Sequence, residues 1–114
     1  MIFLEPAFDA AEFDDLSEMI GEDGVLEMVW IFETETRNRL RRLVAGGQDA
    51  ATMVREMHTL KGAAGTVAAP RLAAMGRQFE MAAQKGIAPT SRDLAAIEQA
   101  LDAFLAALKK RASG

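Results

Sequence analysis

The sequence predicts an all-α domain, an antiparallel four-helix bundle with a short additional N-terminal helix. Three observations support this fold class. Apolar residues recur at steps of three and four in five segments, strand-like alternation does not persist, and Gly or Pro residues separate neighbouring segments. The 114 residues, half of them hydrophobic, suffice for one core, so we expect a single domain over residues 1–114.

The first two predicted helices cover residues 9–20 and 24–45. Asp9 has a glutamate three residues later, which is the spacing of a capping box. Gly21 and Gly24 bracket the expected break between the helices. The second helix begins acidic and ends basic, which complements the helix dipole. The core stripes are Phe13, Leu16 and Ile20 in the first helix, and Val25, Val29, Phe32, Thr36, Leu40 and Leu43 in the second.

The other three predicted helices cover residues 49–67, 70–85 and 91–109. Pro70 suits the first turn of its helix, where an N–H has no partner to lose. The tail after Lys109 is expected to fray. The stripes, in order, are Met53, Met57, Leu60, Ala64 and Val67; Leu72, Met75, Phe79, Ala82 and Ala83; and Leu94, Ile97, Leu101, Phe104, Leu105 and Leu108.

Composition argues against several classes of function. The chain has no cysteine and one histidine, so disulfides, zinc-thiolate sites and multi-histidine metal sites are not expected. A net charge of -4 disfavours nucleic-acid binding. The first eight residues lack the basic region of a secretory signal, and no apolar run reaches the roughly 20 residues that span a bilayer. We therefore expect a cytoplasmic protein with no cofactor or metal of its own and no nucleic-acid or membrane partner.

The third helix carries an unusual polar strip. Successive helical residues are about 100° apart, so with His58 at zero, Arg55 lies at about +60° and Lys61 at about -60°. On the same basis, Gly62 and Gly65 lie at about +40° and -20°. The core stripe of this helix centres at about -130°. His58 is therefore expected to face away from the core.

The two glycines beside His58 call for an explanation. A glycine inside a helix costs about 0.8–1.0 kcal/mol relative to alanine, and alanines occupy the positions between Gly62 and Gly65. Missing Cβ atoms would let another molecule approach the imidazole closely. Lys61 would place an ammonium beside any anion bonded to the ring. A lone helical histidine is usually just a surface residue, so spacing alone does not name a function.

Residues 57–65, Met-His-Thr-Leu-Lys-Gly-Ala-Ala-Gly, resemble the signature of histidine-containing phosphotransfer (HPt) domains. That signature is an apolar residue, His, two residues, Lys-Gly and then small residues. The resemblance extends to Phe32, to Asp49 before the third helix and to the leucine-then-glutamate pattern of the fourth. It covers residues 8–108.

The resemblance implies that His58 takes a phosphoryl group on Nε2 from the aspartate of one receiver domain and passes it to another. It also implies that Glu80 hydrogen-bonds Nδ1, which would leave the Nε2 lone pair free to attack. The receiver would bring Mg²⁺, and a histidine kinase, often a hybrid one, would stand upstream. Lys61, and Arg77 one turn before Glu80, would help to hold phosphate.

Recognition is expected to involve the surface around His58. Supporting or docking positions are Gly62, Gly65, Arg55 and Thr59, and candidate apolar contacts are Ile31, Trp30, Leu16 and Ile20. For Trp30 we favour simple packing beneath the first helix over docking. An exposed working face suggests a monomer.

Three alternatives remain, and one position departs from the family. Kinase dimerisation domains usually follow their histidine with an acidic residue and a nearby proline, whereas Thr59 and Leu60 follow His58. The chain also lacks the glycine-rich boxes of an ATP-binding domain, so we expect no kinase activity of its own. A docking-only relative and an independent enzyme have less support. Many HPt domains have glycine where this chain has Ala68, which leaves the shape of that turn open.

Overall fold

The computed structural model describes residues 2–113 and contains five α-helices, with no strand in that range. The predicted all-α class is therefore confirmed. Residues 1 and 114, at the ends of the expected domain, lie outside the described range. The helices are α1 Ala10–Ile20, α2 Glu22–Ala45, α3 Ala50–Gly65, α4 Pro70–Gln84 and α5 Ser91–Ser113.

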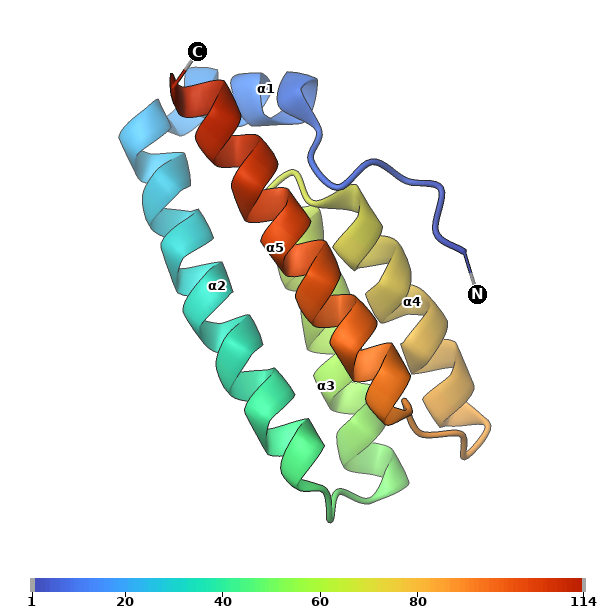
Figure 1. The fold of residues 1–114 in the computed structure, drawn as a ribbon. Coiled ribbons are helices and arrows are strands. Elements are labelled where there is room, and N and C mark those ends of the chain that lie inside the picture. Colours follow the sequence, from blue (N-terminus) through green and yellow to red (C-terminus); the bar gives the residue numbers. More distant parts are fainter. Residues whose placement is uncertain (1, 114) are drawn as a thin grey trace.

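The four long helices, α2 to α5, lie alongside one another in an elongated bundle (Figure 1). Its principal extents are 42 × 24 × 20 Å. α1 lies across the end at which α2 begins and α5 ends. Residues 66–69 reverse the chain between α3 and α4, and these two helices form the most extensive helix pair.

Side-chain caps fix where three of the helices begin. Asp9 and Asp49 each accept a hydrogen bond from the backbone N–H three residues later, at 3.0 and 2.8 Å. Before α5, Thr90 Oγ1 accepts from the Asp93 N–H at 3.1 Å, and Asp93 Oδ2 accepts from the Thr90 N–H at 2.9 Å. This reciprocal pair is a capping box. Fixed starts determine which residues of each helix face the core.

The core consists of one apolar stripe from each long helix, as predicted. All the stripe residues predicted for the four long helices are buried except Ala82 and Leu105, which are partly buried. Val67 belongs to the turn, because α3 ends at Gly65, two residues before the predicted end of that helix. The Phe104 ring lies 6.0 Å from that of Phe32 and 6.0 Å from that of Phe8, which joins the core to the N-terminal segment.

α2 begins earlier than predicted. The helix starts at Glu22, so Gly24 lies in its first turn and not in a break. Gly21 alone makes the break, because its φ of 85° is readily adopted only by glycine. Two acidic residues then occupy the first turn, where the helix dipole favours negative charge.

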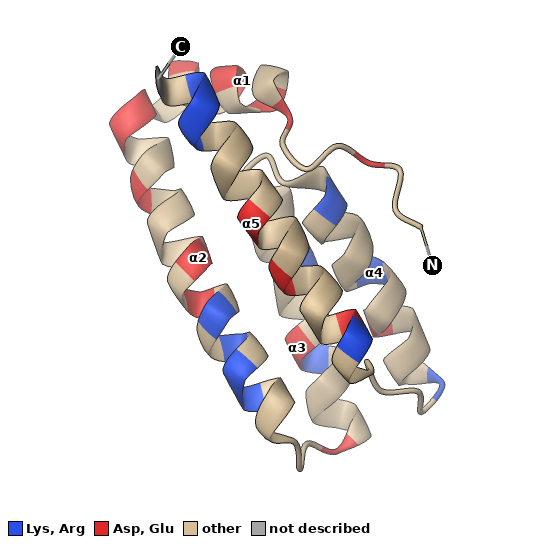
Figure 2. Cartoon of the chain, viewed as in Figure 1, with Lys and Arg blue, Asp and Glu red and all other residues tan. Residues whose placement is uncertain are grey.

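α5 ends later than predicted. The expectation that the chain frays after Lys109 is wrong, since the helix continues to Ser113. Arg111 near its end donates hydrogen bonds to both carboxylate oxygens of Asp14 in α1. Figure 2 shows this basic end of α5 beside the acidic α1. A contact between residues so far apart in sequence is invisible to local pattern analysis.

The turn between α3 and α4 has, at Ala68, the backbone conformation that suits the glycine implied there by the family resemblance. Ala68 has a φ of 65°, the left-handed region that favours glycine, and its side chain is buried. Its carbonyl accepts a hydrogen bond from the Asp9 N–H at 3.0 Å, which ties the turn to the start of α1. The turn keeps the left-handed conformation despite the alanine.

Charge on the bundle surface is mixed. Figure 2 shows acidic residues toward the start of α2 and basic residues toward its end. Within residues 2–113, no helix combines the length and apolarity required to cross a membrane.

Candidate functional site

His58 lies on the outward face of α3. Its side chain is 65% exposed, whereas Met57 and Leu60 on either side of it are fully buried. α3 starts at the Asp49 cap, and from that start the helical repeat turns His58 to the surface. The predicted orientation of this residue away from the core is present in the structure.

Glu80, on the neighbouring helix α4, lies beneath the imidazole. Its Oε2 is 2.8 Å from His58 Nδ1, and its side chain is only 10% exposed. The contact that the family resemblance implied is therefore present. It joins one exposed and one buried side chain, so the ring is anchored on its inner edge and open on its outer edge.

Lys61 completes a three-residue cluster with Glu80 and His58. Lys61 Nζ donates a hydrogen bond to Glu80 Oε1 at 2.6 Å, so each carboxylate oxygen has its own partner. The hydrogen bond from Lys61, with a smaller contribution from His58, lowers the pKa of Glu80 although burial opposes the shift. Glu80 is consequently ionised at neutral pH.

The ionised carboxylate determines the tautomer of a neutral ring at His58. A carboxylate can only accept hydrogen bonds, so the 2.8 Å contact requires the proton on Nδ1. Nε2 then carries the free lone pair. A neutral imidazole held in this way is a nucleophile whose reactive nitrogen faces solvent.

The glycines of the polar strip have no packing role within the chain. Gly62 and Gly65 are exposed, and a Cβ atom added at either would meet no atom within 4 Å beyond its chain neighbours and the adjacent backbone of α3. Their backbone is helical, so no unusual φ requires glycine there. Nothing inside the protein offsets their cost to helix stability.

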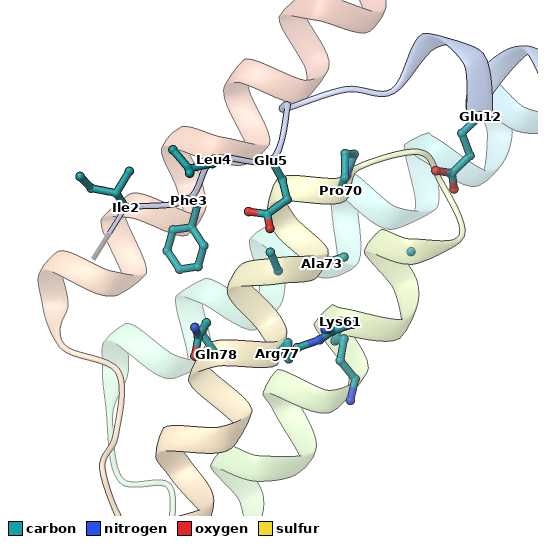
Figure 3. A pocket seen from close by; sticks show the side chains of 12 residues that line it. Ile2, Phe3, Leu4, Glu5, Glu12, Lys61, Pro70, Ala73, Arg77 and Gln78 are labelled. Carbon is teal, nitrogen blue, oxygen red and sulfur yellow. The ribbon is translucent and has the colours of Figure 1, made fainter.

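The other predicted supporting residues are not all brought to the ring. Arg55 is exposed, and its guanidinium donates to Thr52 Oγ1 at 3.1 Å, toward the start of α3. Thr59 is exposed beside His58. Arg77 lies on α4 and points toward Lys61 (Figure 3). Lys61 and Arg77 therefore form the basic side of the site.

A groove of about 640 Å³ lies next to the cluster, between the N-terminal segment, α3 and α4 (Figure 3). Lys61 and Gly65 belong to its lining, as does Arg77. The N-terminal segment is held on α4 by Arg71, whose backbone N–H donates to the Pro6 carbonyl at 3.1 Å and whose Nε donates to the Glu5 carbonyl at 2.9 Å. Glu5 and Glu12 also line the groove, so it carries both acidic and basic side chains beside the cluster.

The candidate apolar contacts separate into two groups. Ile31 is exposed and shares a shallow groove between α2 and α3 with Ala63 and Thr66. Leu16 is partly buried and Ile20 is exposed on α1. The expectation that Trp30 packs beneath the first helix is wrong, because its side chain is 66% exposed. Trp30 is one residue, or about 100°, around α2 from Ile31 and faces solvent.

Gly76 is a residue of the site that sequence reasoning missed. It is buried in the middle of α4, and a Cβ atom there would lie 2.7 Å from the backbone nitrogen of Lys61 and 2.9 Å from its Cα. The available signal was a glycine on the inward face of α4, between Leu72 and Phe79, in a helix that otherwise uses alanine freely.

Residues 2–113 hold no group of three His, Cys, Asp or Glu side chains placed to bind a metal ion. The site thus consists of an exposed imidazole, a buried carboxylate and a lysine, on a small helical domain.

Comparison with models of known protein families identifies one family. The Hpt domain family matches residues 27–109, from within α2 to near the end of α5. The chain belongs to the Hpt domain family. No curated protein and no solved structure matched it in the corresponding comparisons.

Proposed function

We propose that this protein is a phosphoryl carrier of a phosphorelay, with His58 Nε2 as the acceptor atom. The observation that supports this most strongly is the contact of 2.8 Å between His58 Nδ1 and the buried Glu80. It leaves Nε2 unprotonated and open to a partner. We also infer that α2 to α5 form an antiparallel four-helix bundle, supported by the short connections between them.

In the transfer step, the His58 Nε2 lone pair attacks the phosphorus of an aspartyl phosphate on a receiver domain. The N–P bond forms as the acyl O–P bond breaks, and the aspartate leaves as a carboxylate. The ring keeps its Nδ1 proton and becomes positively charged, and the Glu80 carboxylate stabilises that charge. Attack by the aspartate of a second receiver reverses these changes.

Lys61 and Arg77 are the cations of this chain that would stabilise the transferring phosphoryl oxygens. Lys61 is close to the ring through their shared partner Glu80, and Arg77 points toward Lys61 from α4. The receiver domain would supply Mg²⁺ and its own acidic residues. The chain's own contribution is therefore mostly positioning and charge.

The receiver would dock on the surface around His58. Gly62 and Gly65 leave space beside the ring, and Ile31 offers an exposed apolar contact across the shallow groove between α2 and α3. A Gly62→Gln variant should bind a cognate receiver more weakly in calorimetric titration because the added side chain fills that space. Unchanged affinity and transfer would remove this role from Gly62.

The function is tested with a panel of phosphorylated receiver domains at short reaction times. Wild-type protein should acquire a label that acid removes and alkali does not, and His58→Gln should acquire none. The His58→Gln protein must keep the helical circular dichroism of the wild type for the comparison to count. Label retained in His58→Gln, or a wild type that accepts phosphoryl from no receiver, would contradict the proposal.

A further inference from the structure

At Gly76 the backbone of α4 lies directly against the backbone of α3 at Lys61. A Cβ atom at this position would lie 2.7 Å from the Lys61 nitrogen, 2.9 Å from its Cα and 3.0 Å from its Cβ. Ordinary contact begins at 3.4 Å, so no larger residue is accommodated in the present arrangement. Two of the three obstructing atoms are backbone atoms, which cannot swing aside as a side chain can.

This contact lies level with the reactive cluster. α3 and α4 are joined by a tight turn and run in opposite directions, so residues before Lys61 on α3 meet residues after Gly76 on α4. One turn before Lys61 is His58, and one turn after Gly76 is Glu80. These two side chains meet at 2.8 Å.

The carboxylate of Glu80 contacts two side chains of α3 at the same time, one with each oxygen. Its Oε2 is 2.8 Å from His58 Nδ1 and its Oε1 accepts from Lys61 Nζ at 2.6 Å. A change of side-chain torsion could restore one of these contacts after the helices move apart. Restoring both is harder, because the two oxygens are fixed relative to each other and the His58 imidazole is a rigid ring, although the flexible Lys61 side chain can follow part of a shift.

We propose that Gly76 is a positioning residue for the histidine site. By letting the backbone of α4 rest against Lys61, it sets the distance at which Glu80 meets His58 and Lys61 together. Glycine is a poor helix former, and the neighbouring alanines of α4 show that a better one is used where space allows. The inference rests on the proposed function, since it explains how the acceptor ring is oriented.

The test compares Gly76→Ala with the wild type by two measurements. The first is the ¹⁵N chemical shift of each ring nitrogen of His58, which reports whether the neutral ring carries its proton on Nδ1. The second is the initial rate of phosphoryl uptake from a phosphorylated receiver. Gly76→Ala should lose part of the Nδ1–H population and take up phosphoryl roughly 10- to 100-fold more slowly, because small misplacements of a reacting group cost about this much.

Ile97→Val is the matched control. Ile97 is fully buried on α5, outside the cluster, so its truncation loosens the core without moving Glu80. It should leave the ring shifts and the uptake rate at wild-type values at temperatures where the protein is folded. If Gly76→Ala is unfolded in buffer, both variants are measured in trimethylamine N-oxide, which favours the compact state.

A double-mutant cycle separates positioning from a general structural role. In a Glu80→Ala background, Gly76→Ala should cause no further loss of rate, because the group that it positions is gone. Wild-type ring shifts and rate in Gly76→Ala, or full additivity with Glu80→Ala, would overturn the inference and leave the proposed function intact. Altered ring shifts in Gly76→Ala, in a protein whose wild type accepts no phosphoryl, would instead contradict the proposed function alone.

Discussion

Glycines inside helices occur in two settings around His58, and the two have opposite physical explanations. Between the helices, Gly76 is buried against the backbone of Lys61, where a Cβ atom would collide at 2.7 Å. On the outer face of α3, a Cβ atom at Gly62 or Gly65 would meet nothing within 4 Å beyond its chain neighbours and the adjacent helix backbone. The first glycine is explained by a contact within the chain, whereas the other two are not.

The difference separates a glycine that packing within the chain explains from two that such packing does not explain. Gly62, inside α3, costs about 0.8–1.0 kcal/mol of helix stability relative to alanine, and Gly65, at the last residue of α3, costs less. No internal contact offsets that cost. Clear space beside an exposed imidazole is useful only to a molecule that approaches it, which agrees with the proposed docking of a receiver domain.

Removing the carboxylate between the helices should have the largest effect. Glu80→Ala leaves His58 Nδ1 without its acceptor, so phosphoryl uptake should fall by about 10- to 100-fold, as when the orienting partner of a functional histidine is lost. Glu80→Gln keeps an oxygen acceptor and should lose less. Initial rates with one phosphorylated receiver measure both variants, and a wild-type rate in Glu80→Ala would show that the contact has no catalytic value.

Removing the lysine of the cluster should change the titration of Glu80. Lys61 is the main cause of the lowered pKa of that carboxyl, so Lys61→Met should raise it. A lowered folded-state pKa contributes stability above the unfolded-state pKa, and the contribution disappears as pH falls through the folded-state pKa. Lys61→Met should therefore be less stable than the wild type above the unfolded-state pKa of Glu80, and the difference should shrink as the pH falls toward the folded-state pKa.

The titration is followed by the ¹³C carboxyl resonance of Glu80 in the two proteins. Lys85→Met makes the same chemical change at an exposed position at the end of α4, so it serves as the control and should leave the resonance unchanged. Identical midpoints in the wild type and Lys61→Met would show that the 2.6 Å contact does not persist in solution.

Alanine substitutions should separate the two kinds of glycine by the sign of their effect. Gly62→Ala should raise the free energy of unfolding by about 0.8–1.0 kcal/mol, and Gly65→Ala, at the last residue of α3, should raise it by less. Gly76→Ala should lower it by about 1–3 kcal/mol, as overpacking does. Urea unfolding with an unchanged m-value is the measurement. A loss of stability in Gly62→Ala would reveal a role within the chain that its open surroundings do not show.

The turn at Ala68 should give the smallest effect. Glycine would relieve about 1–2 kcal/mol of strain from the left-handed backbone conformation. It would also remove a buried methyl group and make the unfolded chain more flexible. These two losses together cost a similar amount. Ala68→Gly should therefore change the free energy of unfolding by less than about 1 kcal/mol, whereas the β-branched Ala68→Val should be clearly destabilising. Thermal and urea unfolding check both, and equal stability of all three proteins would contradict the strained φ.

Local features of the sequence were sufficient to predict most of the fold. The stripes of α2 to α5 and the cap at Asp9 depend on residues within or next to one helix, and all are present. The end of α5 depends on Arg111 meeting Asp14 across the molecule. Trp30 was misassigned because an aromatic residue normally packs, and its position relative to α1 depends on how the two helices cross.

The part of the site that lies on α3 could be predicted from the sequence, because the helical repeat fixes how residues of one helix are placed around its axis. The helical repeat placed His58 outward and Lys61 beside it, while Glu80 was reached only through the family resemblance. The sharing of Glu80 by both residues and the close approach at Gly76 depend on the distance between α3 and α4. A repeat within each helix carries no information about that distance.

The most direct test of the account asks which ring nitrogen of His58 carries the phosphoryl group. Protein labelled with ¹⁵N in histidine is phosphorylated by a cognate receiver and examined by ¹⁵N and ³¹P NMR. The account predicts phosphorus bonded to Nε2, with the proton kept on Nδ1 and donated to Glu80. Phosphorus on Nδ1, or on a residue other than His58, would contradict it.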